Sequence, residues 1–268
     1  MLLLLLMPLL AFSSDFIFFE GSSLERFILK AEEAKVIYLG ETHDREDIHQ
    51  LQLRILKELD KKGYEIVLLM EAFQQPFQEA LDEYVEGYID EEEMLKRTEY
   101  KRRWGFDKEL YAPLWRFARE RGIKLIALNV PSELVRDVKR RGLGKVRSGY
   151  LPEKVMPLRK EHREFILKAM KEHKSSVEKS FLDVQLAWDT GMAYKIAKTA
   201  LAYPRAKLVV IVGSGHVWRG YGIPERVNFL LGDIPQLVSY VQEDTFYFLF
   251  SKDFSRDNSS TNSSKEPN

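Results

Sequence analysis

The sequence has no cysteine, and this absence removes several kinds of site at once. Disulfides, thiolate-bound metals, iron–sulfur clusters and cysteine nucleophiles all require a thiol and are excluded. A lipid attached to an N-terminal cysteine is excluded for the same reason. Chemistry in this chain therefore depends on oxygen and imidazole groups.

An excess of either charge is also absent, since 41 basic residues balance 41 acidic ones. Proteins that bind nucleic acid usually carry a basic excess, so we expect no nucleic-acid partner. The local basic run 136–147 is typical of a solvated helix end and loop. Hydrophobic residues make up 45% of the 268 residues, which is enough for the core of one α/β domain.

Several well-known catalytic motifs are missing. The chain has no Walker loop, no dinucleotide-binding fingerprint and no Gly-x-Ser-x-Gly elbow. Gly213-Ser214-Gly215 resembles the elbow only superficially, because His216 follows it. His43 and His49 fit neither the spacing nor the order of the zinc-protease helix His-Glu-x-x-His. These enzyme classes are therefore not indicated.

The first twelve residues form an apolar run that is too short to cross a bilayer, which takes about 20 residues. The run fits the hydrophobic part of a secretory signal, so we expect a signal peptide over 1–13 and an exported protein, periplasmic or membrane-associated. No Lys or Arg precedes the run, which leaves an uncleaved anchor or a misassigned start codon as alternatives. Residues 251–268 are rich in Ser, Asn and charge and predict a disordered tail, so the single domain would span 14–250.

Short apolar runs alternate with longer amphipathic stretches. Strands are expected at 35–40, 65–70, 124–128 and 207–212, with a closing pair at 237–242 and 245–250. Helices are expected at 46–61, 78–84, 91–99, 108–121, after an N-cap at Ser132, at 158–174 and at 177–201. This alternation predicts an α/β fold: a mostly parallel central sheet flanked by helices on both faces, with helical insertions.

Polar side chains follow each of the four main predicted strands. They are Glu41 and His43, then Glu71, then Asn129, and finally His216. Ligands of open α/β sheets bind beyond the carboxyl ends of the strands, so we expect these side chains to meet at one edge. Both histidines stand in Gly-x-x-His, where glycine permits a tight turn.

Two chemical interpretations suit this group. Two histidines with one carboxylate are a recurrent divalent-metal set, so His43, Glu71 and His216 are candidate ligands and Glu41 a candidate base. A carboxylate beside a histidine can instead fix its tautomer. Each histidine could also be a hydrogen-bonding residue at a turn.

Further candidates lie outside the strand ends. Gln185 and Asp189 share a face of the helix 177–201 and either line the site or face solvent, while Trp188 and Ile196 are assigned to the core. Arg159 and His162 either reach the site or, as we favour, form surface ion pairs with neighbouring glutamates, and we interpret His49 and His173 as solvated. The aromatic residues Trp104, Phe106 and Tyr111 adjoin the cations at 101–103, and either hold a flat anionic ligand such as haem or anchor a loop.

The ordered series of motifs resembles the ChaN-like haem-binding uptake family. The resemblance covers about residues 30–242 and rests on these segments: Gly40–His43, Met70–Phe73, Trp104, Tyr111–Leu114, Ile126–Pro131, Gln185–Ala193, Gly213–His216 and Gly222–Arg226. The family is grouped with the TIKI and TraB proteins, some of which are metalloproteases using paired Gly-x-x-His motifs, and looks related to erythromycin esterases.

The resemblance implies an exported haem-binding protein linked to iron uptake. A haem or small-molecule ligand, a homodimer and membrane-associated uptake machinery are the implied partners. A tyrosine is the implied haem ligand, for which Tyr111 and Tyr150 are candidates. The chain departs from lipoprotein members because it has no cysteine to carry lipid.

Two alternatives remain at this point. One is a metal-dependent peptidase or esterase that uses the paired histidines. The acidic, imidazole-rich set favours it, since a haem pocket should be largely apolar. The other is a scaffold with a vestigial site.

Overall fold

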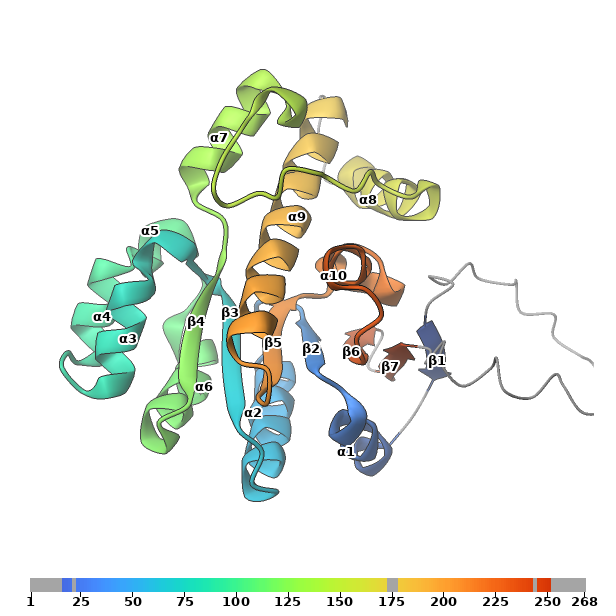
Figure 1. Ribbon diagram of the computed structural model, residues 1–268. Helices are drawn as coiled ribbons and strands as arrows, with labels where there is room; N and C mark the ends of the chain where they lie inside the picture. The colour runs from blue at the N-terminus through green and yellow to red at the C-terminus, as the bar shows by residue number, and fades with distance from the viewer. Residues whose placement is uncertain (1–15, 21–22, 173–177, 243–244, 252–268) are drawn as a thin grey trace, which may run out of the picture.

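A computed structural model of the chain describes residues 16–20, 23–172, 178–242 and 245–251. Its seven strands form one sheet in the order β1-β7-β6-β2-β5-β3-β4 (Figure 1). Strand β2 pairs in parallel with β5 and β6, β3 pairs in parallel with β5 and β4, and β7 pairs antiparallel with β6 and β1. The strands are β1 Phe16–Glu20, β2 Val36–Glu41, β3 Ile66–Gln74, β4 Lys124–Asn129, β5 Lys207–Gly213, β6 Gln236–Gln242 and β7 Thr245–Ser251.

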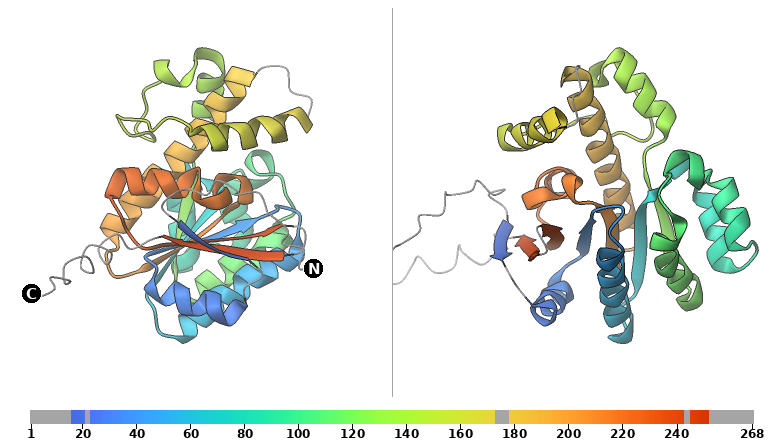
Figure 2. Two further views of the ribbon diagram at one scale, coloured as in Figure 1. Left: turned by 90° about the vertical axis from the view of Figure 1, so that its right-hand side faces the viewer. Right: turned by 180° about the vertical axis from the view of Figure 1, so that it is seen from behind.

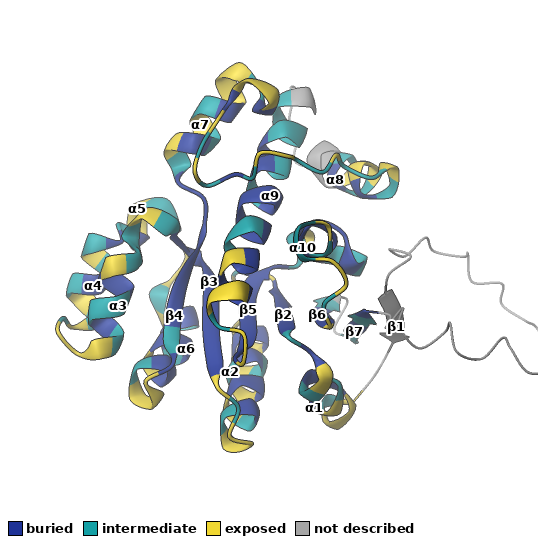
Figure 3. Cartoon of the chain, in the orientation of Figure 1, coloured by how far each residue is buried: buried dark blue, intermediate teal, exposed yellow. Residues whose placement is uncertain are grey.

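Helices cover both faces of this sheet, which confirms the predicted fold class (Figure 2). Every residue of β2, β3 and β5 is buried, as expected of parallel strands between two helical layers (Figure 3). Alternate side chains of β2 enter different cores: Ile37 packs with α1, α2 and α6, while Val36 packs with α9 and α10. These helices are α1 Leu24–Glu33, α2 Glu46–Lys61, α6 Lys108–Arg121, α9 Glu178–Ala202 and α10 Ile223–Leu231.

A helical cap rises beyond the carboxyl end of β4 (Figure 1). It consists of α7 Ser132–Arg141, α8 Lys160–Glu172, the loop between them and the first half of α9. A third apolar cluster holds the cap together and includes Leu134, Val138, Leu151 and Val184. Three further helices, α3 Gln78–Glu86, α4 Glu91–Arg97 and α5 Tyr100–Arg103, link β3 to α6.

Several local predictions are wrong in detail. Ser132 is the first residue of α7 and not its N-cap, because its hydroxyl instead accepts a hydrogen bond from Gln74 Nε2 at 2.7 Å. The strand predicted at 65–70 is β3, and it extends to Gln74 beyond a shift in its register with β4 after Met70. Ser251 ends β7 in a buried position and so does not begin a tail. The strand β1 and the helices α1, α5 and α10 were not predicted.

The predicted signal segment 1–13 and the remaining tail 252–268 lie outside the described residues. Among the residues that are described, no helix combines the length and apolar character needed to cross a membrane.

Candidate functional site

The parallel pairing of β2, β5, β3 and β4 gathers the polar strand ends at one edge of the sheet. Glu41 lies opposite Gly213, and Gln74 lies opposite Asn129. A short 3-10 turn at 214–216 then follows β5 and carries His216 over this edge. The register therefore brings together residues that are up to 175 positions apart in the sequence.

The first element of the site is a hydrogen-bonded pair formed by Glu41 and His43. The Nδ1 atom of His43 lies 2.8 Å from Oε1 of Glu41, which is buried. Tyr111 donates its hydroxyl hydrogen to the same oxygen at 2.7 Å, and Gln52 Nε2 donates to the other oxygen at 3.3 Å. The carboxylate thus fixes which nitrogen of His43 carries a proton.

His49 contacts the residues of this pair, although it was predicted to be solvated. It is buried, with Nδ1 3.1 Å from the Gln52 side-chain oxygen and Nε2 3.2 Å from the backbone oxygen of His43. The prediction was wrong because the amphipathic pattern of α2 does not reveal that His49 faces the end of β2. His173 lies outside the described residues.

The ring of His43 packs between aromatic side chains and the backbone of β5. Its centroid lies 4.7 Å from that of Trp104 and 4.8 Å from that of Phe106. Burial opposes the charged imidazole, but the hydrogen bond that His43 donates to Glu41 and the charges of Glu71 and Glu41 outweigh it, so the pKa of His43 is raised. A Cβ at Gly213 would lie 3.0 Å from Cε1 of His43, so the glycine makes room for the ring.

His216 is held between two carboxylates. Its Nδ1 lies 2.6 Å from Oδ1 of Asp189, and its Nε2 lies 3.3 Å from Oε1 of Glu71. Gln185 donates to the same Asp189 oxygen at 3.1 Å. Burial disfavours the charged ring, but the charges and hydrogen bonds of Glu71 and Asp189 prevail and raise its pKa to about 10. Burial likewise opposes the ionised form of Glu71, yet His216 holds the pKa of that carboxyl below its usual value.

This geometry does not support the predicted metal set of His43, Glu71 and His216. Among the described residues no group of three or more His, Asp or Glu side chains is placed to hold an ion. The physical reason is that both ring nitrogens of His216 are engaged by carboxylates, Nδ1 by Asp189 and Nε2 by Glu71. Glu71 is also engaged, since its Oε2 accepts from the backbone nitrogen of Gly213 at 2.7 Å.

A pocket of about 440 Å³ opens above these groups. His43, Glu71 and His216 line its inner end, and Trp104, Phe106 and Trp188 are among its walls. Asn129 also lines it and is 8% exposed, and no described residue provides a hydrogen-bond partner for its Oδ1. The remaining lining residues are Gln74, Arg103, Val130, Ser132, Val135 and Arg136.

The other predicted site residues have mixed positions. Asp189 is fully buried and contacts His216, so the solvent-facing alternative for this helix face is wrong. Trp188 lines the pocket, whereas Ile196 is in the core as expected. Tyr111 is buried, and burial together with the nearby Glu41 charge raises its pKa, so its hydroxyl stays protonated. Tyr150 lies in the cap loop and is not among the residues that line this pocket.

The interpretation as surface ion-pairing residues is wrong for His162, whereas Arg159 is partly exposed and does form an ion pair. His162 is fully buried and stacks on Tyr221 with ring centroids 5.9 Å apart. Arg159 pairs with the buried Glu225 at 2.9 Å, a partner 66 positions away that no local pattern indicates. Sequence reasoning likewise did not identify Gln52, Gln74, Ser132 and Arg136 as site residues. Of these, only Ser132 carried a signal, as the first polar residue after the β4 end.

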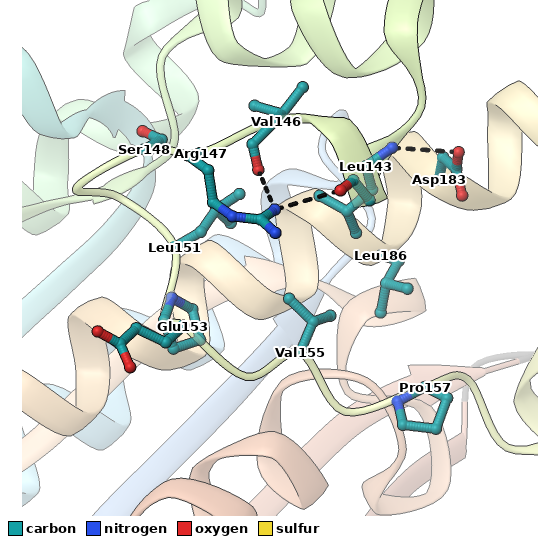
Figure 4. Close-up of a pocket in the computed structure, with 12 residues that line it drawn as sticks. Leu143, Val146, Arg147, Ser148, Leu151, Glu153, Val155, Pro157, Asp183 and Leu186 are labelled. Atoms are coloured by element: carbon teal, nitrogen blue, oxygen red, sulfur yellow. Dashed lines mark hydrogen bonds between the residues drawn. The ribbon is translucent and has the colours of Figure 1, made fainter.

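A second pocket, of about 640 Å³, lies in the cap (Figure 4). Its walls are mainly apolar and include Leu143, Val146, Leu151, Val155 and Leu186. Two of its charged lining residues bind backbone atoms: Asp183 accepts from the Leu143 nitrogen, and Arg147 donates to the oxygens of Gly144 and Val146. None of its lining residues is His, Tyr, Met or Cys.

Comparison with known proteins establishes the family. Residues 27–227 match the family described as "Haem-binding uptake, Tiki superfamily, ChaN". The chain belongs to this family. The predicted resemblance is thereby confirmed, and the ChaN family binds haem.

Individual relatives are more distant. ChaN of Campylobacter jejuni, described by its cofacial haem binding, shares the ChaN fold at a TM-score of 0.63 and 19% identity, with 91% of this chain and 100% of that one covered. An erythromycin esterase gives a TM-score of 0.47 at 11% identity over 82% of this chain and 75% of that one. RETICULATA-RELATED 5, a chloroplastic protein of Arabidopsis thaliana, is 32% identical over 130 residues, which are 46% of this chain and only 17% of that protein.

Proposed function

We propose that this protein binds haem in the pocket at the sheet edge and that His43 is the axial ligand of the iron. The observation that supports this most directly is the Glu41–His43 pair at the inner end of an aromatic-walled pocket. Histidine is a common haem ligand, and a carboxylate on its second nitrogen orients the ring and raises its basicity. Bound haem would supply the iron-centred chemistry.

The side chains around His43 fit such a ligand. Its Nδ1 is engaged by Glu41, and the described residues offer Nε2 no hydrogen-bond partner. Trp104, Phe106 and Trp188 provide flat apolar surfaces against which a porphyrin can pack. By contrast, His216 is held by two carboxylates and the Tyr111 hydroxyl by one, so neither suits the role of ligand.

The cap pocket is larger, but its lining residues are less suited to binding haem iron. Its apolar walls would accept a porphyrin, but no residue that lines it has a side chain that ordinarily ligates haem iron. We therefore place haem in the sheet-edge pocket, which contains a suitable iron ligand, although the cap pocket is larger.

A volume of about 440 Å³ is at the lower end of the ~300–1,000 Å³ typical of ligand sites. Part of a porphyrin would thus remain outside the pocket. We extend the proposal to a homodimer in which two such exposed haems stack, by analogy with the cofacial binding described for Campylobacter jejuni ChaN. Export and a role in haem or iron uptake, with membrane-associated partners, complete the proposal.

The test is titration of the protein with haem, followed at the Soret band. We expect saturable binding with one haem per chain, and loss of the ligated spectrum in His43→Ala. A spectrum and affinity unchanged in His43→Ala would overturn His43 as the ligand. A lack of saturable binding by the wild-type protein would overturn the function itself.

The Glu41–His43 pair also supports a second candidate function, hydrolysis without a metal. A histidine with a raised pKa beside an ionised Glu71 is suited to move protons to and from an ester or peptide bond. The test is hydrolysis of p-nitrophenyl esters of several chain lengths by the haem-free protein. Turnover that falls at least ~100-fold in His43→Gln would support this candidate, and turnover indifferent to that change would exclude it.

A further inference from the structure

The outer rim of the sheet-edge pocket contains a carboxylate bound by two arginines. Glu133, at the start of α7, accepts hydrogen bonds from Arg103 at 3.0 and 3.2 Å and from Arg136 at 3.1 Å. Both arginines line the pocket. The Glu133 side chain is 52% exposed, so solvent can reach it when it leaves the arginines.

Arg103 is held in place independently of Glu133. Its Nη1 donates to the Gln74 side-chain oxygen at 2.7 Å, its Nε donates to Glu99, and its guanidinium lies 4.8 Å above the ring of Phe77. Only 11% of the Arg103 side chain is exposed. The guanidinium group of Arg103 would therefore keep its position at the pocket if Glu133 moved away.

A separate feature of the same pocket also indicates a ligand. Asn129 is 92% buried and lines the pocket, and its Oδ1 has no partner among the residues that the structure describes. Buried polar atoms are nearly always hydrogen-bonded, so an orphan on a pocket wall points to a polar group of a bound molecule. The pocket thus offers an amide on its wall, aromatic rings beside it, and two cations at its rim.

We propose that Glu133 occupies the subsite for an acidic group of the ligand, and that a ligand carboxylate displaces it to bind Arg103 and Arg136. This inference rests on the proposed haem function and assigns the haem propionates to these two arginines. Arginine binds carboxylates through parallel hydrogen bonds, and Glu133 shows that the geometry suits one. Glu133 then acts as an internal competitor that lowers affinity for acidic ligands.

The size of the effect follows from the exposure of the pair. Arg136 is 69% exposed and Glu133 52%, and such surface ion pairs change an equilibrium by roughly one- to fivefold. We therefore expect Glu133→Gln to tighten haem binding about three- to fivefold and Arg136→Gln to weaken it by a similar factor. Both variants leave the Glu41–His43 pair untouched.

The experiment compares haem with haem dimethyl ester, which has the same ring and iron but no carboxylates. Wild type, Glu133→Gln and Arg136→Gln are each titrated with both porphyrins. The matched controls are Asp137→Asn and Arg140→Gln, which change the same charges in an ion pair on the same helix, away from the pocket lining. The substitutions at 133 and 136 should alter the affinity for haem only, and the control substitutions should alter neither affinity.

The possible results distinguish haem binding itself from displacement of Glu133 by a haem carboxylate. Wild-type protein that binds haem, with affinities insensitive to both rim substitutions, would overturn this inference and leave the haem function standing. Equal effects of the rim substitutions on haem and its diester would overturn it as well, because they would not involve the carboxylates. Failure of wild-type protein to bind either porphyrin would overturn the haem function and this inference together.

Discussion

Glu41 fixes His43 through a hydrogen bond of 2.8 Å between Oε1 and Nδ1, and the two residues are only two positions apart. The pair spans the end of β2, where the strand stops and the chain turns outward. The buried carboxylate therefore anchors one nitrogen of the ring and leaves the other for chemistry in the pocket.

Removal of the His43 ring should leave a space that free imidazole can fill. In His43→Gly we expect the Soret band of ligated haem to be lost and then restored by millimolar imidazole, because Glu41 and Tyr111 would still orient the added ring. Absorbance titration measures both steps. Rescue would separate ligation from folding damage, whereas a band that persists in His43→Gly without imidazole would show that another residue ligates the iron.

The contact between Gly213 and His43 should be sensitive to a single methyl group. A Cβ at Gly213 would lie 3.0 and 3.2 Å from Cε1 and Nε2 of His43, so Gly213→Ala should displace the ring. Overpacking of this kind costs about 1–3 kcal/mol, and we expect haem affinity to fall about tenfold. Gly215→Ala is the matched control because no atom lies within 4 Å of its added Cβ. Equal affinities of the two variants would contradict the prediction.

His216 should remain charged well above neutral pH. Its folded pKa of about 10 exceeds that of an unfolded histidine, so its stabilising effect is complete below about pH 6.5 and is lost as the pH rises toward 10. We expect its ring signals in an NMR titration to move only in that alkaline range. Asp189→Asn should shift the titration to lower pH, since it removes one of the two carboxylates. A wild-type midpoint near 6.5 would show that the ring is not held as an ion.

His162 should have the opposite effect on stability at acid pH. Burial lowers its pKa to about 4, so between about pH 6.5 and 4 the unfolded chain binds a proton that the folded chain resists. The free energy of unfolding should therefore fall by about 3 kcal/mol as the pH drops through this range. Urea denaturation at pH 7, 5.5 and 4.5 measures this loss. His162→Gln should remove most of the dependence, and an equally steep loss in that variant would assign it to other groups.

Local sequence patterns were enough to predict the sheet and most of its helices. The helices α2 and α6 begin and end at the predicted residues 46, 61, 108 and 121, because their apolar periodicity is strong and Gly63 or Gly122 follows. The helix α10 was missed because it is short and buries the charged residues Glu225 and Arg226 in its first turn, so apolar periodicity does not mark its buried face. The strand β1 has no partner close in sequence, since it pairs with β7 at the other end of the chain.

The sequence by itself determined which residues would meet, because parallel strands place their carboxyl ends at one edge whatever the details of packing. Glu41, His43, Glu71, Asn129 and His216 could thus be named as neighbours. Only the tertiary structure decided what each of them can do. His216 lies between Asp189 and Glu71, which engage both of its ring nitrogens, while the described residues offer Nε2 of His43 no hydrogen-bond partner. Contacts between segments far apart in the chain set these differences, and no local pattern encodes them.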